Sequence, residues 1–75
     1  MQNLEEILRS IVKRSIQELH DDLYPKKLGK AIERRTPEQR IVTIAKYEGR
    51  AEVLQELGAD IKELENKIDE ELKKF

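Results

Sequence analysis

The carboxy-terminal twenty-two residues carry apolar side chains in alternating steps of three and four, which is the spacing of one face of an α-helix. These seam positions are Leu54, Leu57, Ile61, Leu64, Ile68, Leu72 and Phe75. A helix that began near Thr36 and ran to the end of the chain would contain about 38 residues and be roughly 57 Å long. The rest of a 75-residue chain is too small to cover such a helix. The seam therefore predicts a surface that binds another chain.

Composition favours an all-α fold, because 41% of the residues are charged, 37% are hydrophobic and only three are aromatic. The chain has no cysteine and a single histidine, His20, which argues against disulfides and a zinc site. A domain of 75 residues has a small core that is only marginally stabilising. Association with a partner is the remaining source of stability, and no cofactor is expected.

The clearest helix covers residues 4–23, with Asn3 as its N-cap. Its apolar side chains fall within about half of a helical wheel. They are Leu4, Ile7, Leu8, Ile11, Val12, Ile16, Leu19 and Leu23. Because half a wheel is wider than the stripe needed against one neighbour, we expect this helix to lie in a groove between two others.

Pro25 ends the first helix and opens a short second helix over residues 25–34, so the amino-terminal part forms a helical hairpin. Thr36, Pro37 and Gln39 then form a strong helix start, with a capping hydroxyl, a proline at the first helical position and a capping-box glutamine. The predicted fold is this hairpin followed by a long helix over residues 37–74, with a coiled-coil-like distal half. Self-association would complete the bundle.

Gly58 offers an alternative, because it could end one helix while Asp60 and Glu63 cap another, which would fold the tail back on the chain. The seam nevertheless keeps its phase through this glycine. A true turn has no need to preserve that phase, so continuity is the favoured prediction. If the chain turns here, the seam is expected to pack on the first helix of its own chain.

The direction of association stays open. Ile61 and Ile68 at position a, with leucines at d, are typical of a parallel two-stranded coil. The charged residues favour the antiparallel direction instead. A parallel pair would place Asp60 opposite Glu65 of the partner, which repels it, whereas an antiparallel pair would place Asp60 near Lys67.

Two parts of one domain follow from this interpretation: a small helical domain over residues 1–55, and an oligomerisation or partner-binding extension over residues 56–75. No catalytic constellation is visible in the sequence. We therefore expect a non-enzymatic interaction module, a dimer or a complex with a helical partner protein, that serves as a small regulator, inhibitor or assembly factor. The interface is assigned to the seam residues.

A nucleic-acid-binding dimer is the rival hypothesis. Residues 24–50 carry eight basic and three acidic groups, whereas residues 51–75 carry four basic and eight acidic groups. The anion-binding candidates are Lys26, Lys27, Lys30, Arg34, Arg35 and Arg40. The slightly negative total charge and the scarcity of aromatic residues count against this hypothesis.

Residues 47–54 resemble stretches found in small phage reading frames, a resemblance that implies no activity. No segment approaches the roughly 20 apolar residues that would span a bilayer, and the amino terminus lacks a signal-peptide pattern. We expect a cytoplasmic protein without membrane attachment.

Overall fold

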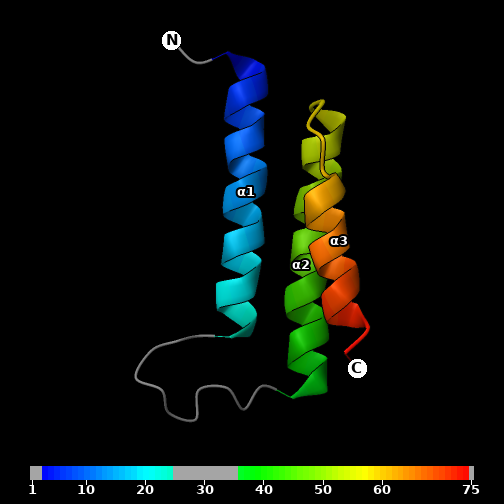
Figure 1. The fold of residues 1–75 in the computed structure, drawn as a ribbon. Helices are drawn as coiled ribbons and strands as arrows, with labels where there is room; N and C mark the ends of the chain where they lie inside the picture. Colours follow the sequence, from blue (N-terminus) through cyan, green and yellow to red (C-terminus); the bar gives the residue numbers. More distant parts are fainter. Residues whose placement is uncertain (1–2, 25–35, 75) are drawn as a thin grey trace.

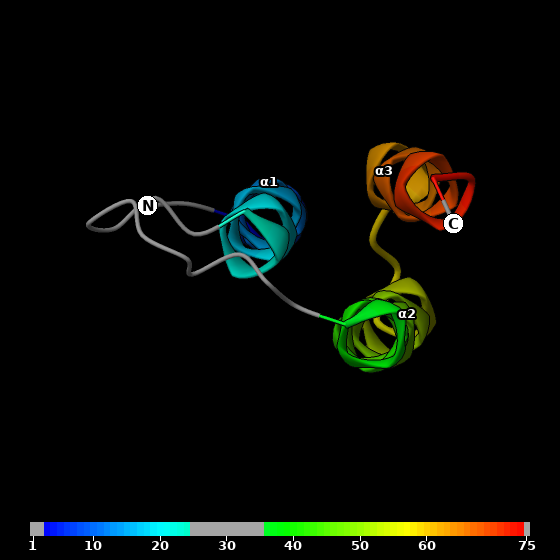
Figure 2. The same ribbon diagram turned by 90° about the horizontal axis from the view of Figure 1, so that it is seen from below.

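The computed structural model describes residues 3–24 and 36–74, and within these ranges the chain forms three α-helices (Figure 1). α1 spans Leu4–Leu23, α2 spans Pro37–Glu56 and α3 spans Lys62–Leu72. α2 runs antiparallel to α1, and α3 runs back alongside α2. Viewed end on, the helices occupy the corners of a triangle (Figure 2). The predicted all-α class is confirmed.

The first two helices begin where the sequence predicts. Asn3 caps α1, because its Oδ1 accepts the Glu6 N–H at 2.8 Å, and Thr36 caps α2, because its Oγ1 accepts the Gln39 N–H at 3.1 Å. In both caps the third helical residue also bonds back to the cap N–H, which completes a capping box. These side chains satisfy backbone donors that a helix leaves without partners.

The core lies between the three helices, and α1 packs against both others, as its wide apolar face predicts. Buried apolar side chains come from all three helices and from the turn before α3. They are Leu8, Val12, Leu19, Leu23, Ile44, Tyr47, Ala51, Leu54, Ile61, Leu64 and Ile68. Two polar residues, Ser15 and Glu71, are buried among them.

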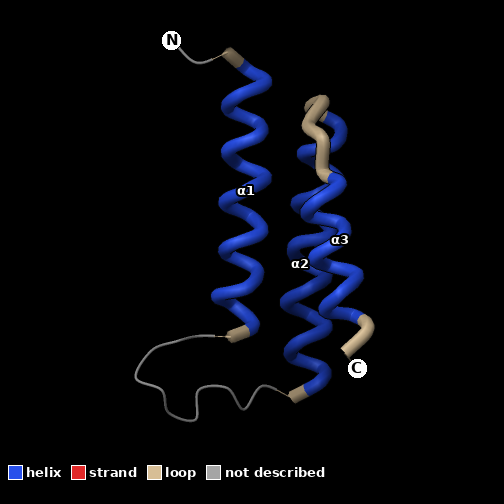
Figure 3. Tube along the Cα trace, viewed as in Figure 1, coloured by secondary structure: helices blue, strands red, loops and turns tan. Residues whose placement is uncertain are grey.

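The predicted continuous helix over residues 37–74 is wrong, because the chain turns between α2 and α3 (Figure 3). The Ala59 N–H donates to the Leu54 carbonyl and the Gly58 N–H to the Gln55 carbonyl, both at 2.9 Å, in the pattern of a Schellman motif. Gly58 has a φ of +98°, in the left-handed region that favours glycine. The apolar phase alone could not reveal this turn, because folding back buries the same face.

The turn at Gly58 is the alternative to the continuous helix, but the capping box of Asp60 and Glu63 that accompanied this alternative does not form. Ile61 is the N-cap of α3 and has no side-chain capping bond, while Asp60 Oδ1 accepts the Lys62 N–H at 3.1 Å. The helix predicted over residues 25–34 lies outside the described residues. Among the helices that are described, none combines the length and apolar character that crossing a membrane requires.

Candidate functional site at the polar end of the bundle

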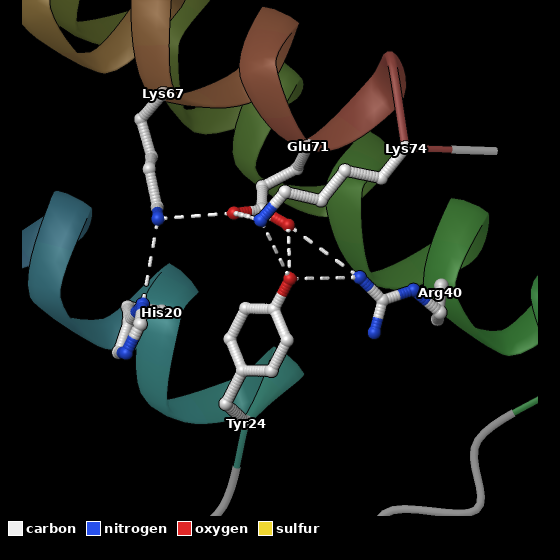
Figure 4. A network of polar contacts seen from close by, with 6 residues as sticks. All are labelled: His20, Tyr24, Arg40, Lys67, Glu71 and Lys74. Carbon is white, nitrogen blue, oxygen red and sulfur yellow. Dashed lines mark hydrogen bonds and ion pairs between the residues drawn. The ribbon is translucent and has the colours of Figure 1, made fainter.

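One end of the bundle gathers polar side chains from all three helices. α1 ends there, α2 begins there and α3 ends there (Figure 1). We call this cluster the polar end. Its members are His20, Tyr24, Arg40, Lys67, Glu71 and Lys74 (Figure 4).

Glu71 lies at the centre of the polar end, and its side chain is fully buried. Its Oε1 accepts the Tyr24 hydroxyl at 2.6 Å and lies 3.4 Å from Arg40 Nη2. Its Oε2 lies 3.0 Å from Lys67 Nζ and 3.3 Å from Lys74 Nζ. A buried carboxylate is costly unless it is paired and hydrogen-bonded, and here both oxygens have charged partners.

Tyr24 connects the end of α1 to this carboxylate. Its backbone N–H donates to the His20 carbonyl at 2.8 Å and closes α1, and its side chain points towards Glu71 of α3 (Figure 4). The hydroxyl accepts from Lys74 at 3.1 Å and from Arg40 at 3.2 Å while it donates to Glu71. Both cations also lie over the ring, 5.2 Å and 5.3 Å from its centroid.

The charged environment shifts two pKa values at the polar end. Burial alone would raise the pKa of Glu71, but the hydrogen bonds from Tyr24, Lys67 and Lys74 outweigh it and lower that pKa from 4.5 to about 2. The pKa of Lys74 is raised by its contacts with the Tyr24 hydroxyl and with Glu71. Both shifts favour the ionised groups, so the network is a persistent charge cluster at neutral pH.

This arrangement holds helices together but does not resemble a reaction centre. The carboxylate is surrounded by its own cations, and Lys67 is further engaged with His20 Nδ1 at 3.4 Å. General base chemistry needs a group whose pKa lies near the working pH, and the pKa of Glu71 lies far below it. In residues 3–24 and 36–74, no cluster of three His, Cys, Asp or Glu side chains is placed to hold a metal ion.

A second polar cluster joins the last two turns of α1 to the middle of α2. Tyr47 donates its hydroxyl to Asp22 Oδ2 at 2.5 Å, and Arg50 Nη1 lies 2.5 Å from Glu18 Oε1. The Arg50 guanidinium also lies over the Tyr47 ring, 4.7 Å from its centroid. Burial and the bond to Asp22 raise the pKa of Tyr47 to about 12, so its hydroxyl stays a donor.

The opposite end of the bundle carries exposed apolar side chains. Leu4 and Ile7, in the first turn of α1, are 66% and 41% exposed. Val53, near the end of α2, and Leu57, its C-cap, are 57% and 59% exposed. Because α1 and α2 are antiparallel, these four residues lie at the same end of the molecule (Figure 1), which we call the apolar end.

Many of the seam residues assigned to an interface lie inside the bundle. Leu54, Ile61, Leu64 and Ile68 are buried against the other helices. Leu57 and Leu72 are exposed, and Phe75 lies outside the described residues.

The basic candidates Lys26, Lys27, Lys30, Arg34 and Arg35 fall outside the described residues as well. Arg40, the remaining anion-binding candidate, contacts Tyr24 and Glu71 at the polar end.

Sequence reasoning missed Tyr24, Lys67, Glu71 and Lys74 as a unit. A signal for Glu71 was present, because it lies seven residues after Leu64 and three after Ile68, on the buried face of α3. A glutamate at that position predicts buried cations on the neighbouring helices. Which cations they are depends on the bundle geometry.

Comparisons with protein-family models, with characterised proteins and with solved structures find no match to this chain. Its function is therefore inferred from the geometry of the chain itself.

Proposed function

We propose that this chain is a non-enzymatic interaction module that self-associates, with a dimer favoured, and acts as a small regulator, inhibitor or assembly factor for another protein. The observation that supports this proposal is the apolar end, where Leu4, Ile7, Val53 and Leu57 are all at least 41% exposed. Large apolar side chains that one copy leaves exposed at one end are candidates for contact with another chain. In this proposal residues 56–75 form the oligomerisation element of the single domain.

A second copy is the occupant that the apolar end favours. Leu57 continues the apolar spacing of Leu54 and Ile61 but lies outside the core of one copy. Leu57 is in phase with a buried face but is not covered within one copy. A second chain that covers Leu57 would explain this position.

The test replaces Val53 and Leu57 together with lysine. Both side chains are more than half exposed, so the core of one copy should stay intact. We expect the wild-type protein to associate with rising concentration and the double variant to remain a monomer in sedimentation velocity. Val42→Lys is the matched control, because Val42 is 69% exposed on the same helix but near its other end. A wild-type protein that stays monomeric at every concentration would overturn the proposal.

A nucleic-acid-binding dimer remains the second candidate, and one observation favours it. Three cations, Arg40, Lys67 and Lys74, converge on the single carboxylate of Glu71 at the polar end. Tyr24, the C-cap of α1, and Thr36, the N-cap of α2, flank residues 25–35 in the sequence, and α1 ends and α2 begins at that same end (Figure 1). An excess of positive charge there would attract phosphates.

This candidate predicts salt-dependent binding of nucleic acid. The affinity should fall steeply with added salt and be lost in a variant with alanine at Lys27, Arg34 and Arg35. Fluorescence anisotropy with a labelled duplex and a labelled single strand at low salt measures both effects. If neither the duplex nor the single strand changes the anisotropy, the candidate is excluded.

A further inference from the structure

The turn between α2 and α3 is a simple hinge. It is closed by the two Schellman bonds at Gly58 and Ala59, and Gly58 has a φ of +98°. A Cβ added at Gly58 would meet no atom within 4 Å. The turn therefore depends on the left-handed backbone conformation of Gly58, while Ala59 and Ile61 beside it pack against the core.

The apolar positions keep helical phase through this hinge. Leu54, Leu57 and Ile61 are spaced by three and four residues, as on one face of an uninterrupted helix. In the turn, Leu57 is 59% exposed. If residues 57–61 became helical, Leu57 would lie on the same face as its two neighbours in the seam. The sequence is thus suited to a continuous helix as well as to the turn.

A single chain straightened in this way would lose much of its core. α3 would leave its own α1 and α2, and Leu64, Ile68 and Glu71, all buried in the bundle, would be exposed. Tyr24 would lose its hydrogen bond to Glu71, and Lys67 would lose its contact with His20. The α3 helix of a second copy carries the same side chains and can restore each of these contacts.

We propose that the chain forms a domain-exchanged dimer, in which α2 and α3 become one helix hinged at Gly58 and each α3 packs on the α1 and α2 of the other copy. This inference rests on the proposed self-association and specifies its geometry. Exchange between identical chains is a low-cost route to a dimer, because the contacts of the monomer are reused. Short hinge loops favour it.

The position of the hinge explains the apolar end. α3 begins at that end, so a straightened α2 would lead directly from the apolar end of one bundle to that of the other (Figure 1). The two apolar ends would then face each other, with Val53 and Leu57 of both copies near the crossing. The two long helices would be antiparallel, as α2 and α3 are within one copy.

The pairing of α2 with α3 fits this geometry. The groove between them is lined by Ala51 and Gln55 of α2, by Ile68 of α3 and by Ile61 just before it. Residues near the end of α2 therefore face residues near the start of α3. In two antiparallel straight helices the same pairs form between the two chains without a shift in register. The groove, which Glu52 and Glu65 also line, is then retained.

The first test changes the hinge. Gly58→Ala disfavours the left-handed turn and favours the continuous helix in both chains. We expect it to raise the association constant at least tenfold after refolding at equal concentration, measured by light scattering. Gly49→Ala is the matched control, because Gly49 also has nothing within 4 Å but lies inside α2 in both forms, so its association constant should change less than twofold. Two glycines inserted after Gly58 should reduce association.

The second test identifies which chain supplies α3. The protein has no cysteine, so introduced pairs are unique. One double variant, His20→Cys and Lys67→Cys, places one cysteine on α1 and a nearby one on α3. A second double variant, Glu18→Cys and Arg50→Cys, places one on α1 and a nearby one on α2. After refolding at high concentration and reaction with a short bismaleimide, the first pair should give dimers on a denaturing gel. The second pair should link only within one chain.

The outcomes separate this inference from the proposed function. Cross-chain links for the α1–α3 pair alone, together with a dimer favoured by Gly58→Ala, support the exchange. A dimer by mass in which both pairs link only within one chain overturns the exchange and leaves self-association standing. Monomers for the wild type and for Gly58→Ala at every concentration overturn both.

Discussion

The two ends of the bundle are closed by different physical means. At the polar end, a buried glutamate is bound by a tyrosine, an arginine and two lysines that come from the three helices and their caps. At the apolar end, Leu4, Ile7, Val53 and Leu57 are exposed, and the connection depends on the backbone of Gly58. One end is fixed by directional contacts, whereas the other is closed by a backbone turn; apolar side chains are exposed at both, since Ile41 and Val42 near the polar end are 49% and 69% exposed.

This difference separates stability from association in the molecule. Polar contacts around a buried carboxylate are strong only when their geometry is complete, so the polar end should determine whether the chain stays folded. Exposed apolar side chains add little to the stability of one copy and are available to another chain. Substitutions at the two ends should therefore have different consequences.

The largest expected effect follows removal of the central carboxylate. Glu71→Ala leaves Arg40 and Lys67, each mostly buried, without their shared anion, and should lower the free energy of unfolding by about 3 kcal/mol. Urea unfolding at pH 7 measures it. Glu70→Ala, at the exposed neighbouring position, is the control and should change stability by less than about 0.5 kcal/mol. Equal effects of the two substitutions would contradict the role of the polar end.

The next effect is an acid dependence that originates at the same residue. The pKa of Glu71 is about 2 in the folded chain and 4.5 in its ordinary environment, so its contribution is complete above pH 4.5 and is lost as the pH falls towards 2. About 3 kcal/mol should be lost over that range. Urea unfolding of wild type and Glu71→Gln between pH 5 and about 2 should show a shallower loss in the variant. Parallel curves would refute this assignment.

A smaller effect is expected from the cluster between α1 and α2. Tyr47→Phe removes the hydrogen bond to Asp22 and should cost about 1.5 kcal/mol at pH 7. Because the pKa of Tyr47 is raised from 10 to about 12, its contribution is complete below pH 10 and is lost as the pH rises through 12. The ultraviolet absorbance of phenolate, followed in wild type and variant, reports that titration. A titration of Tyr47 near pH 10 in the folded protein would contradict the prediction.

The smallest effect on folding is expected at the apolar end. Leu4→Ser and Leu57→Ser should each change the free energy of unfolding of the monomer by less than about 0.5 kcal/mol, because both side chains are mostly exposed. Thermal unfolding at a concentration where the protein is monomeric measures this. The same variants should weaken self-association, which sharpens the contrast between the ends. A large loss of monomer stability would show that these leucines belong to the core.

The sequence predicts most of the helical content but not the way in which the helices meet. Helix 4–23 and the start at Thr36 are recognisable because their caps and apolar spacing are local signals. The turn at Gly58 was an alternative that the phase of the seam disfavoured. Phase cannot decide between a straight helix and a hairpin, because both bury Ile61, Leu64 and Ile68 on the same face.

The partners of Glu71 could not be predicted from the sequence for a different reason. Tyr24 and Glu71 are 47 residues apart, and only the packing of α1 against α3 brings them together. The periodic pattern also places Leu72 on the seam, yet Glu71 is buried and Leu72 is partly exposed. Glu71 lies in phase with Leu64 and Ile68 on the buried face of α3, so a charged side chain occupies a core position there and is paired with three cations.

The most direct test of the account is the mass of the wild-type protein in solution as a function of concentration, measured by sedimentation equilibrium after refolding. We predict a mass that rises from the 8.8 kDa of one chain towards twice that value as the concentration increases. A mass that stays at 8.8 kDa up to the highest soluble concentration would contradict self-association through the apolar end.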